Sequence, residues 1–269
     1  MKQKIYFITY GSSKYNLSRK HLIFLAQKSQ FFEECMGFEE KNLSSEFRSQ
    51  FKDLLSNKRG DGYWVWKYDI ISQALNKVNK DDLVVYCDSG TSFNFYAKNR
   101  FYEYIEMLND SNYSNFRICS EKQYIEKYWT SKELFNYFNI EIDSDIGNST
   151  QFEAGHMIFK NNTQTKEYLS RFMNILKADV ELITDRYNST SQIDGFNSVR
   201  HDQSIFSLLS KIYGCVSVKN ETKFQNNLSV QYNYPFLSVR VSGHGLKDQI
   251  KFKLNKSKYF SEPVYFKNE

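Results

Sequence analysis

The sequence predicts an α/β fold in which a mostly parallel central sheet is flanked by helices, formed by one domain over residues 1–269. Residues 83–86 form a continuous run of β-favouring apolar residues that is too short for a buried helix. A strand covered on both faces, as in a parallel sheet, needs such a run. Residues 4–10 form a second strand-like run, which ends at Gly11. The length of 269 residues and the apolar content of 41% suit a single α/β domain with a proper core.

The other elements follow from the spacing of apolar residues along the chain. The sequence predicts helices over residues 18–36, within 39–57, 67–78, 97–108, 124–138 with an interruption at 129–131, 163–183, and 205–213, opened by 201–204. It predicts strands over residues 116–119 and 215–218, and a third strand within 151–159, directly after the polar residues 151–155. Residues 186–199 are polar and predict a loop that could act as a lid.

Asp88 stands just beyond the predicted strand 83–86 and is followed by Ser89 and Gly90. In parallel α/β sheets the ligand crevice lies just outside the carboxyl ends of the strands, so Asp88 is a candidate site residue. The turn after residues 4–10 could receive a nucleoside for the same reason. The alternative is purely structural, because Asp-Ser-Gly is a good turn sequence after a strand.

Lys67 belongs to the inward face of its predicted helix, because the apolar positions 70, 71, 74 and 78 follow it at helical spacing. A cation in the first turn opposes the helix dipole, and a nearby anion such as a phosphate would offset that cost. Arg59, just before Gly60 and Gly62, favours the phosphate interpretation. Alternatively, the lysine side chain extends past the helix start to reach water.

Asp202 has the same kind of placement, because the apolar positions 205, 206 and 209 follow it at helical spacing. It is either a stabiliser of the helix N-terminus or a carboxylate in a cleft. In a cleft it would orient a hydroxyl or balance a positively charged intermediate.

Composition excludes several classes of protein. A net charge of +5, from 36 basic and 31 acidic residues, suits anionic small substrates and is too weak for a nucleic-acid binder. No run approaches the ~20 apolar residues of a membrane span. The four scattered cysteines predict reduced thiols and a cytoplasmic protein. The lysines of residues 247–258 alternate with apolar residues as in a charged edge strand, and they also allow a weak peripheral contact with a membrane surface.

Four segments occur in the order found in GT-A glycosyltransferases: CDSG at 87–90, QFEAGHMIF at 151–159, RHDQSIFSLL at 200–209 and VSGHGLK at 241–247. The chain resembles enzymes of the family 8 type, and also uncharacterised glycosyltransferase-like proteins of bacterial and viral polysaccharide gene clusters. The resemblance implies a hexosyltransferase-like enzyme of surface polysaccharide synthesis that uses a nucleotide-sugar donor, with UDP-sugars favoured, and a glycan or glycoconjugate acceptor. It also implies a nucleotide-binding half at 1–110, an acceptor-side half at 111–269 and retaining chemistry.

The same resemblance implies the site residues. Asp88 matches the first residue of the Asp-x-Asp metal motif, whereas Gly90 replaces the last. Asp88 and His244 would hold Mn²⁺ or Mg²⁺, unless Arg59 and Lys67 carry the phosphate charge without a metal. Asp202 and Gln203 would lie close to the reacting carbon or the acceptor. The spacing arguments and the resemblance together give these candidates for binding the nucleotide sugar: Thr9, Tyr10, Gly11, Arg59, Tyr63, Lys67, Asp88, Ser89, Gly90, Gln151, Ala154 and Gly155.

Two other functions remain open at this point. A non-catalytic nucleotide- or carbohydrate-binding protein could keep the fold and lose the metal motif, which Gly90 makes conceivable. A nucleotidyltransferase on a similar fold would release pyrophosphate instead of a nucleoside diphosphate.

Overall fold

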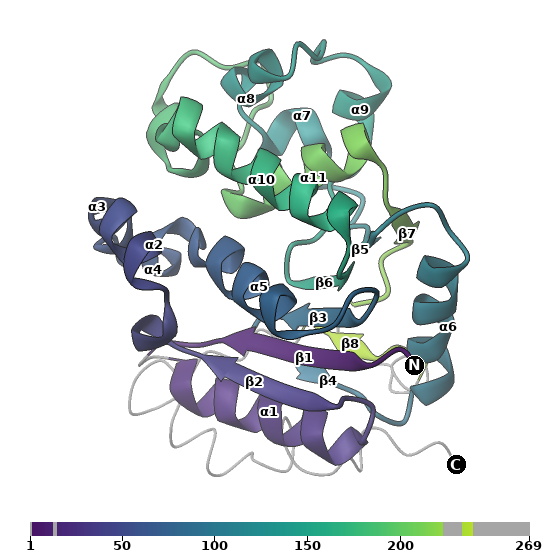
Figure 1. The fold of residues 1–269 in the computed structure, drawn as a ribbon. Helices are drawn as coiled ribbons and strands as arrows, with labels where there is room; N and C mark the ends of the chain where they lie inside the picture. The colour runs from purple at the N-terminus through teal and green to yellow at the C-terminus, as the bar shows by residue number, and fades with distance from the viewer. Residues whose placement is uncertain (1, 13–14, 223–232, 239–269) are drawn as a thin grey trace, which may run out of the picture.

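The computed structural model describes residues 2–12, 15–222 and 233–238 (Figure 1). Its central sheet has six strands in the order β2-β1-β3-β6-β5-β7. Strand β6 is antiparallel to both of its neighbours, and the other five strands share one direction. The predicted α/β class with a mostly parallel sheet is therefore confirmed. The strands are β1 (Ile5–Tyr10), β2 (Glu34–Phe38), β3 (Leu83–Cys87), β5 (Asn115–Ile118), β6 (His156–Lys160) and β7 (Val216–Val218).

Helices cover both faces of this sheet (Figure 1). Helices α1 (Asn16–Ser29) and α6 (Lys98–Asn109) pack on one face, and α5 (Trp66–Lys77), α10 (Thr163–Ala178) and α11 (Asp202–Tyr213) on the other. Strand β3 serves both cores, because Val84 and Tyr86 point to the α5 side and Leu83 and Val85 to the α1 side. All five of its residues are buried, as the apolar run predicted.

Short elements complete the described part of the chain. A two-stranded antiparallel ribbon pairs β4 (Ser92–Phe93) with β8 (Phe236–Leu237). Helices α7, α8 and α9 lie with α10 and α11 at the top of Figure 1. The short helices are η2 (Glu40–Asn42), α2 (Ser45–Gln50), α3 (Lys52–Leu55), α4 (Gly60–Tyr63), α7 (Glu126–Trp129), α8 (Lys132–Tyr137), α9 (Asp145–Asn148), η3 (Val180–Ile183) and η4 (Arg186–Ser189).

Two predicted helices were too long. The helix predicted over 18–36 ends at Ser29, because Gln30 takes a left-handed conformation (φ 58°) and the following chain forms β2 beside β1. The helix predicted over 163–183 ends at Ala178, where the extended Asp179 caps η3. The interruption predicted at 129–131 is confirmed, since Ser131 caps α8. The VSGHGLK segment at 241–247 and the strand-like residues 247–258 lie outside the described residues.

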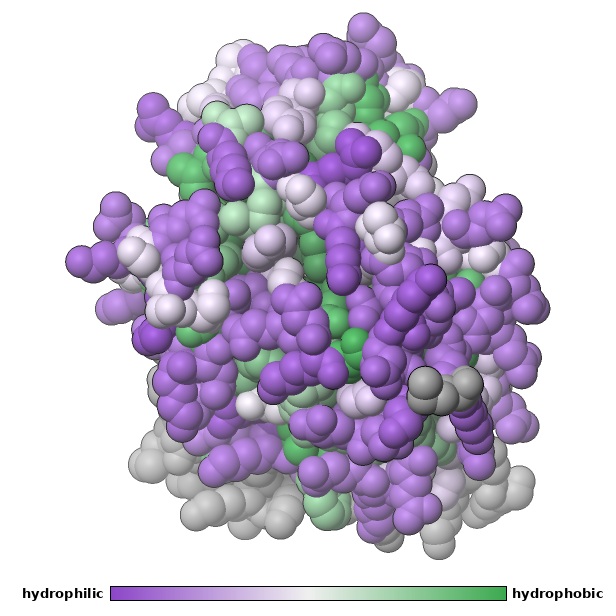
Figure 2. All heavy atoms as spheres, in the orientation of Figure 1, coloured by the Kyte–Doolittle hydropathy of each residue, from purple (hydrophilic) through white to green (hydrophobic). Residues whose placement is uncertain are grey.

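The surface in the view of Figure 2 is mainly hydrophilic, with small separate apolar areas. Within the described residues, no helix combines the length and apolar character needed to cross a membrane.

Candidate active site

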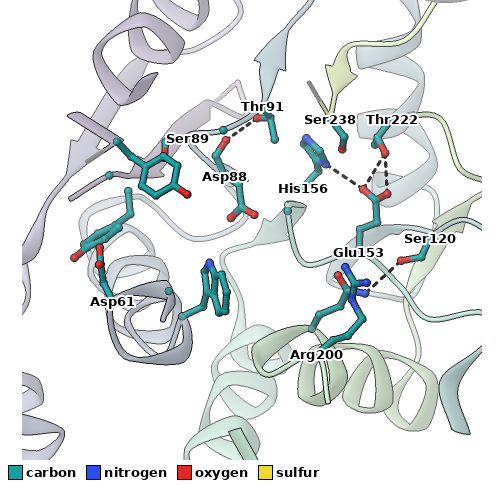
Figure 3. Close-up of a pocket in the computed structure, with 18 of the residues that line it drawn as sticks. Asp61, Asp88, Ser89, Thr91, Ser120, Glu153, His156, Arg200, Thr222 and Ser238 are labelled. Atoms are coloured by element: carbon teal, nitrogen blue, oxygen red, sulfur yellow. Dashed lines mark hydrogen bonds and ion pairs between the residues drawn. The ribbon is translucent and has the colours of Figure 1, made fainter. Parts of the chain in front are cut away.

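A cavity of about 900 Å³ opens at the carboxyl ends of β1 and β3 (Figure 3). Residues 10–12 follow β1 into its wall, and residues 88–91 follow β3. Because β6 runs in the opposite direction, its amino end meets the same rim and brings Glu153, Gly155 and His156 to the cavity. Arg200 and Gln203, at the start of α11, also line it, together with residues from the segments 58–66, 120–124 and 220–222.

The turn after β3 directs the Asp88 side chain into this cavity (Figure 3). The Asp88 carbonyl accepts hydrogen bonds from the Thr91 amide (3.0 Å) and hydroxyl (2.7 Å), and the Asp88 amide donates to the Gly155 carbonyl (2.8 Å). The carboxylate Oδ1 accepts from the Tyr86 hydroxyl and lies 3.1 Å from Lys67 Nζ. The backbone therefore makes the turn that the sequence favours, while the carboxylate stays available to a ligand.

Lys67 is buried next to Asp88, with only 2% of its side chain exposed. Its Nζ lies 2.7 Å from Asp202 Oδ2 and 3.1 Å from Asp88 Oδ1, and donates to the Ala154 carbonyl at 2.9 Å. Burial lowers the pKa of Lys67, but the two carboxylates outweigh it and hold the pKa above its ordinary value. The inward orientation follows the helical spacing, and the interpretation that the side chain reaches water was wrong.

Asp202 opens α11 and is almost completely buried. Burial raises the pKa of its carboxyl group to about 6, although the neighbouring Lys67 ammonium opposes that shift. The carboxylate thus lies against the same ammonium as Asp88. Lys67 holds together two acidic groups from segments more than a hundred residues apart in the sequence.

A second cavity of about 340 Å³ adjoins the first. Among the residues that line the second cavity but not the first are Arg59, Lys67, Trp129 and Asp202. Arg59 forms an ion pair with Asp185 (3.3 Å). The two spaces meet where five residues line both of them: Trp64, Asp88, Gly155, Arg200 and Gln203.

The RGDGYW segment forms an unusual turn. Five successive residues have positive φ angles: Gly60 (59°), Asp61 (50°), Gly62 (92°), Tyr63 (54°) and Trp64 (62°). Only the glycines take this left-handed conformation without strain. The turn presents Asp61 and Trp64 to the first cavity, whereas Tyr63 is buried beside it.

The structure places the predicted site residues in three groups. Tyr10, Gly11, Asp88, Ser89, Gly90, Gly155 and Gln203 line the first cavity, and Arg59, Lys67, Ala154 and Asp202 line the second. Thr9, Tyr63 and Gln151 are buried and line neither cavity, and Gln151 Oε1 accepts a hydrogen bond from Gln203 Nε2 (2.8 Å). His244 lies outside the described residues.

Glu153 was missed by sequence reasoning. Its carboxylate accepts from Thr222 Oγ1 (2.8 Å) and Asn220 Nδ2 (3.0 Å) and faces His156 Nδ1 (3.3 Å; Figure 3). An acidic residue leading into a strand could have been noticed in the sequence. Nothing in the sequence indicates that Asn220 and Thr222 are its partners, because only the pairing of β7 with β5 brings them close to Glu153. Arg200, beside the conspicuous His201-Asp202 pair, was also overlooked.

The described lining of the first cavity is acidic on balance. Four carboxylates (Asp61, Asp88, Glu121 and Glu153) face two cations (Lys58 and Arg200). Within the described residues there is no group of three or more His, Cys, Asp or Glu side chains placed to hold a metal ion. Asp88 Oδ2 accepts no hydrogen bond from any described residue, so Asp88 fits a divalent cation as a single oxygen ligand.

No protein-family model matches the chain, and no curated protein sequence matches it. Among solved structures, a glycosyltransferase involved in the glycosylation of the major capsid of PBCV-1 matches with a TM-score of 0.53 at 12% identity, covering 92% of this chain and 98% of that one. The apo form of the glycosyltransferase GlyE of Streptococcus pneumoniae TIGR4 matches with a TM-score of 0.45 at 13% identity, covering 93% of this chain and 60% of GlyE. Mouse xyloside xylosyltransferase 1 matches with a TM-score of 0.44 at 10% identity, covering 98% and 94%. The first match and the sheet topology show that the chain has a GT-A glycosyltransferase fold.

Proposed function

We propose that this protein is a glycosyltransferase that moves a sugar from a nucleotide-sugar donor to a glycan or glycoconjugate acceptor. The observation that carries the proposal is the meeting of two cavities at Asp88 and Gln203, with Asp202 beside them. A volume of about 900 Å³ suits a nucleotide sugar, and the adjoining 340 Å³ suits a second, smaller substrate. The fold shared with a capsid-glycosylating enzyme supports the same class.

The donor is assigned to the larger cavity, with its diphosphate near Asp88. A diphosphate beside four carboxylates and two cations needs further positive charge. Asp88 is the described residue that would hold Mn²⁺ or Mg²⁺, and His244 is the second candidate. A bound metal would stabilise the charge that develops on the leaving diphosphate.

The acceptor is assigned to the smaller cavity, where Trp64 and Trp129 offer aromatic surfaces for a sugar ring. Breaking the sugar–phosphate bond develops positive charge at the anomeric carbon, which oxygen atoms of Asp202 and Gln203 would stabilise. Because Lys67 holds Asp202 in an ion pair, we assign this carboxylate charge stabilisation and not proton removal. That role agrees with retaining chemistry.

A screen of UDP-, GDP- and CDP-sugars tests the proposal by measuring release of the nucleoside diphosphate. We expect slow hydrolysis of one donor, with UDP-sugars favoured, and faster release once the right acceptor is supplied. Release of pyrophosphate would instead identify a nucleotidyltransferase, and binding without turnover would identify a non-catalytic binding protein. Full activity in EDTA would reject the metal.

We further propose a hexosyl donor, an acceptor from surface polysaccharide synthesis and action in the cytoplasm. The basic residues 247–258 support a weak contact with an anionic membrane surface that carries such acceptors. Mass spectrometry of the products formed from lipid-linked and free oligosaccharide acceptors tests these finer assignments.

A further inference from the structure

A chain of three side chains leads from the protein interior to the boundary between the cavities. Glu126 is fully buried, and its Oε1 accepts a hydrogen bond from Gln151 Nε2 (3.0 Å). Gln151 is also fully buried, and its Oε1 accepts from Gln203 Nε2 (2.8 Å). Gln203 lines both cavities. The three residues belong to α7, the segment before β6 and α11, so tertiary packing alone brings them together.

Glu126 can only accept hydrogen bonds at this position. Thr130 Oγ1 (2.7 Å) and Gln151 donate to Oε1, and Ser207 Oγ (2.6 Å) and Lys211 Nζ (2.5 Å) donate to Oε2. A carboxylate paired with an ammonium has no proton to offer. A second pure acceptor, the Trp129 carbonyl, lies 3.2 Å from the same Gln151 nitrogen.

Glu126 and the Trp129 carbonyl determine the orientation of the Gln151 amide, and through it the orientation of the Gln203 amide. The two ends of a glutamine amide are nearly equal in size, so shape alone does not choose between them. With Glu126 on one side, Gln151 must present its nitrogen there and its oxygen to Gln203. Gln203 must then present its nitrogen to Gln151. The Gln203 oxygen remains, and no described residue donates a hydrogen bond to it.

We infer that Glu126 and Gln151 are positioning residues that hold the Gln203 amide with its carbonyl oxygen available at the junction of the two cavities. A carbonyl oxygen there stabilises positive charge or accepts from a sugar hydroxyl, whereas an NH₂ group would oppose positive charge. The catalytic consequence rests on the proposed function. The orientation itself does not.

The orientation is tested without any activity by a double-mutant cycle on thermal stability. Gln203→Glu places a carboxylate oxygen against Gln151 Oε1, so that two hydrogen-bond acceptors face each other. Glu126 prevents the Gln151 amide from reversing to relieve this contact, so we expect Tm to fall by several degrees. In a Glu126→Gln background only the Trp129 carbonyl still opposes reversal of the Gln151 amide, so the same substitution should cost less. Gln203→Met is the matched control and should cost the same in both backgrounds. An equal cost of Gln203→Glu in both backgrounds would overturn the inference.

If Glu126→Gln does not fold, the pH dependence of Gln203→Glu decides the question. A protonated carboxyl can donate to Gln151 Oε1, so its folded-state pKa should be raised and its stability should be lost as the pH rises. Gln203→Met contains the same neighbouring Asp202, Arg200 and Glu153, and so corrects for their titration. A constant difference in Tm between the two variants from pH 4 to pH 8 would reject the orientation.

The catalytic consequence has its own test, on whichever sugar nucleotide the protein hydrolyses. Glu126→Gln and Gln151→Met should each lower kcat by about tenfold while leaving the KM for the donor unchanged. Neither should lower kcat further in a Gln203→Ala background, since both act through Gln203. Additive losses would contradict that role. Absence of any turnover would count against the proposed function, and the stability cycle would still decide the orientation.

Discussion

At the scale of single residues, Lys67 illustrates how the need for an ion pair can be predicted while its partner is missed. A cation in the first turn of α5 needs a nearby anion, and the sequence suggested a phosphate. The structure supplies two protein carboxylates and a carbonyl, which occupy Lys67 Nζ. We therefore assign the donor phosphates to Arg200 and Lys58, which line the cavity itself.

Asp88 carries the first prediction. Asp88→Ala should reduce nucleoside diphosphate release by at least about a hundredfold, because it removes the carboxylate at the junction of both cavities. The fold should persist, since Lys67 keeps its contact with Asp202. Asp81→Asn, at the opposite rim of the sheet, is the control and should leave the rate unchanged. Near-normal turnover by Asp88→Ala would refute the site.

The raised pKa of Asp202 predicts the sign of a pH dependence of stability. Its folded-state pKa of about 6 exceeds the ordinary value of 3.8, so the folded protein binds this proton more tightly than the unfolded chain. Its contribution to stability is present below the ordinary pKa and is lost as the pH rises through 6. The difference of about two pKa units corresponds to a loss on the order of 2–3 kcal/mol.

Urea denaturation of the native protein and of Asp202→Asn between pH 4 and pH 7.5 measures this effect. The free energy of unfolding should fall more steeply with pH in the native protein than in the variant. Parallel pH profiles would show that Asp202 does not titrate in this range.

At the scale of elements, the left-handed turn at 60–64 combines backbone strain with a position in the cavity wall. Each non-glycine residue in this conformation costs roughly 1–2 kcal/mol, and three of the five residues are not glycine. Packing of the Trp64 ring against His201 (5.3 Å between centroids) helps to hold the turn. Strain of this kind is commonly found at ligand sites.

Gly60 carries the prediction for this turn. A Cβ atom there would lie 2.4 Å from the Trp64 ring, so Gly60→Ala should cost on the order of 2 kcal/mol of stability and change the Trp64 fluorescence. Gly37→Ala, where the φ angle is ordinary and the nearest atom is 3.3 Å away, is the control and should cost less. Equal losses of stability would mean that the turn tolerates a side chain.

The sequence predicts those elements whose apolar spacing continues for several turns, such as α5 and α10. It fails for β2, because Phe31 and Phe32 extend the helical spacing of α1 although Gln30 has already ended the helix. Site residues directly after a strand, such as Asp88, are accessible to sequence reasoning. The hydrogen-bond partners of Glu153 and Gln151 are not, because Thr222 and Gln203 lie dozens of residues away in the sequence.

At the scale of the whole molecule, the two cores lie on opposite faces of one sheet and share its central strands. The pairing of β3 with β6 joins residues 1–110 to residues 111–269 through five residue pairs in the middle of the sheet. We therefore propose that the chain folds as a single cooperative unit.

Differential scanning calorimetry tests whether the chain unfolds as a single cooperative unit. We expect one transition whose calorimetric and van't Hoff enthalpies agree, with a value of about 190 kcal/mol for a chain of this length. Two resolved transitions, or stable folding of residues 1–110 expressed alone, would show that the halves are separate domains.

The reversal of β6 also leaves one rim of the sheet without site residues. The carboxyl ends of β1 and β3 and the amino end of β6 all meet at the cavity, so the amino ends of β3 and β5 face away from it. The connection from α6 to β5 passes through the exposed Asn112 at that distant rim. An affinity tag or fluorescent reporter inserted after Asn112 would therefore label the protein without obstructing either cavity.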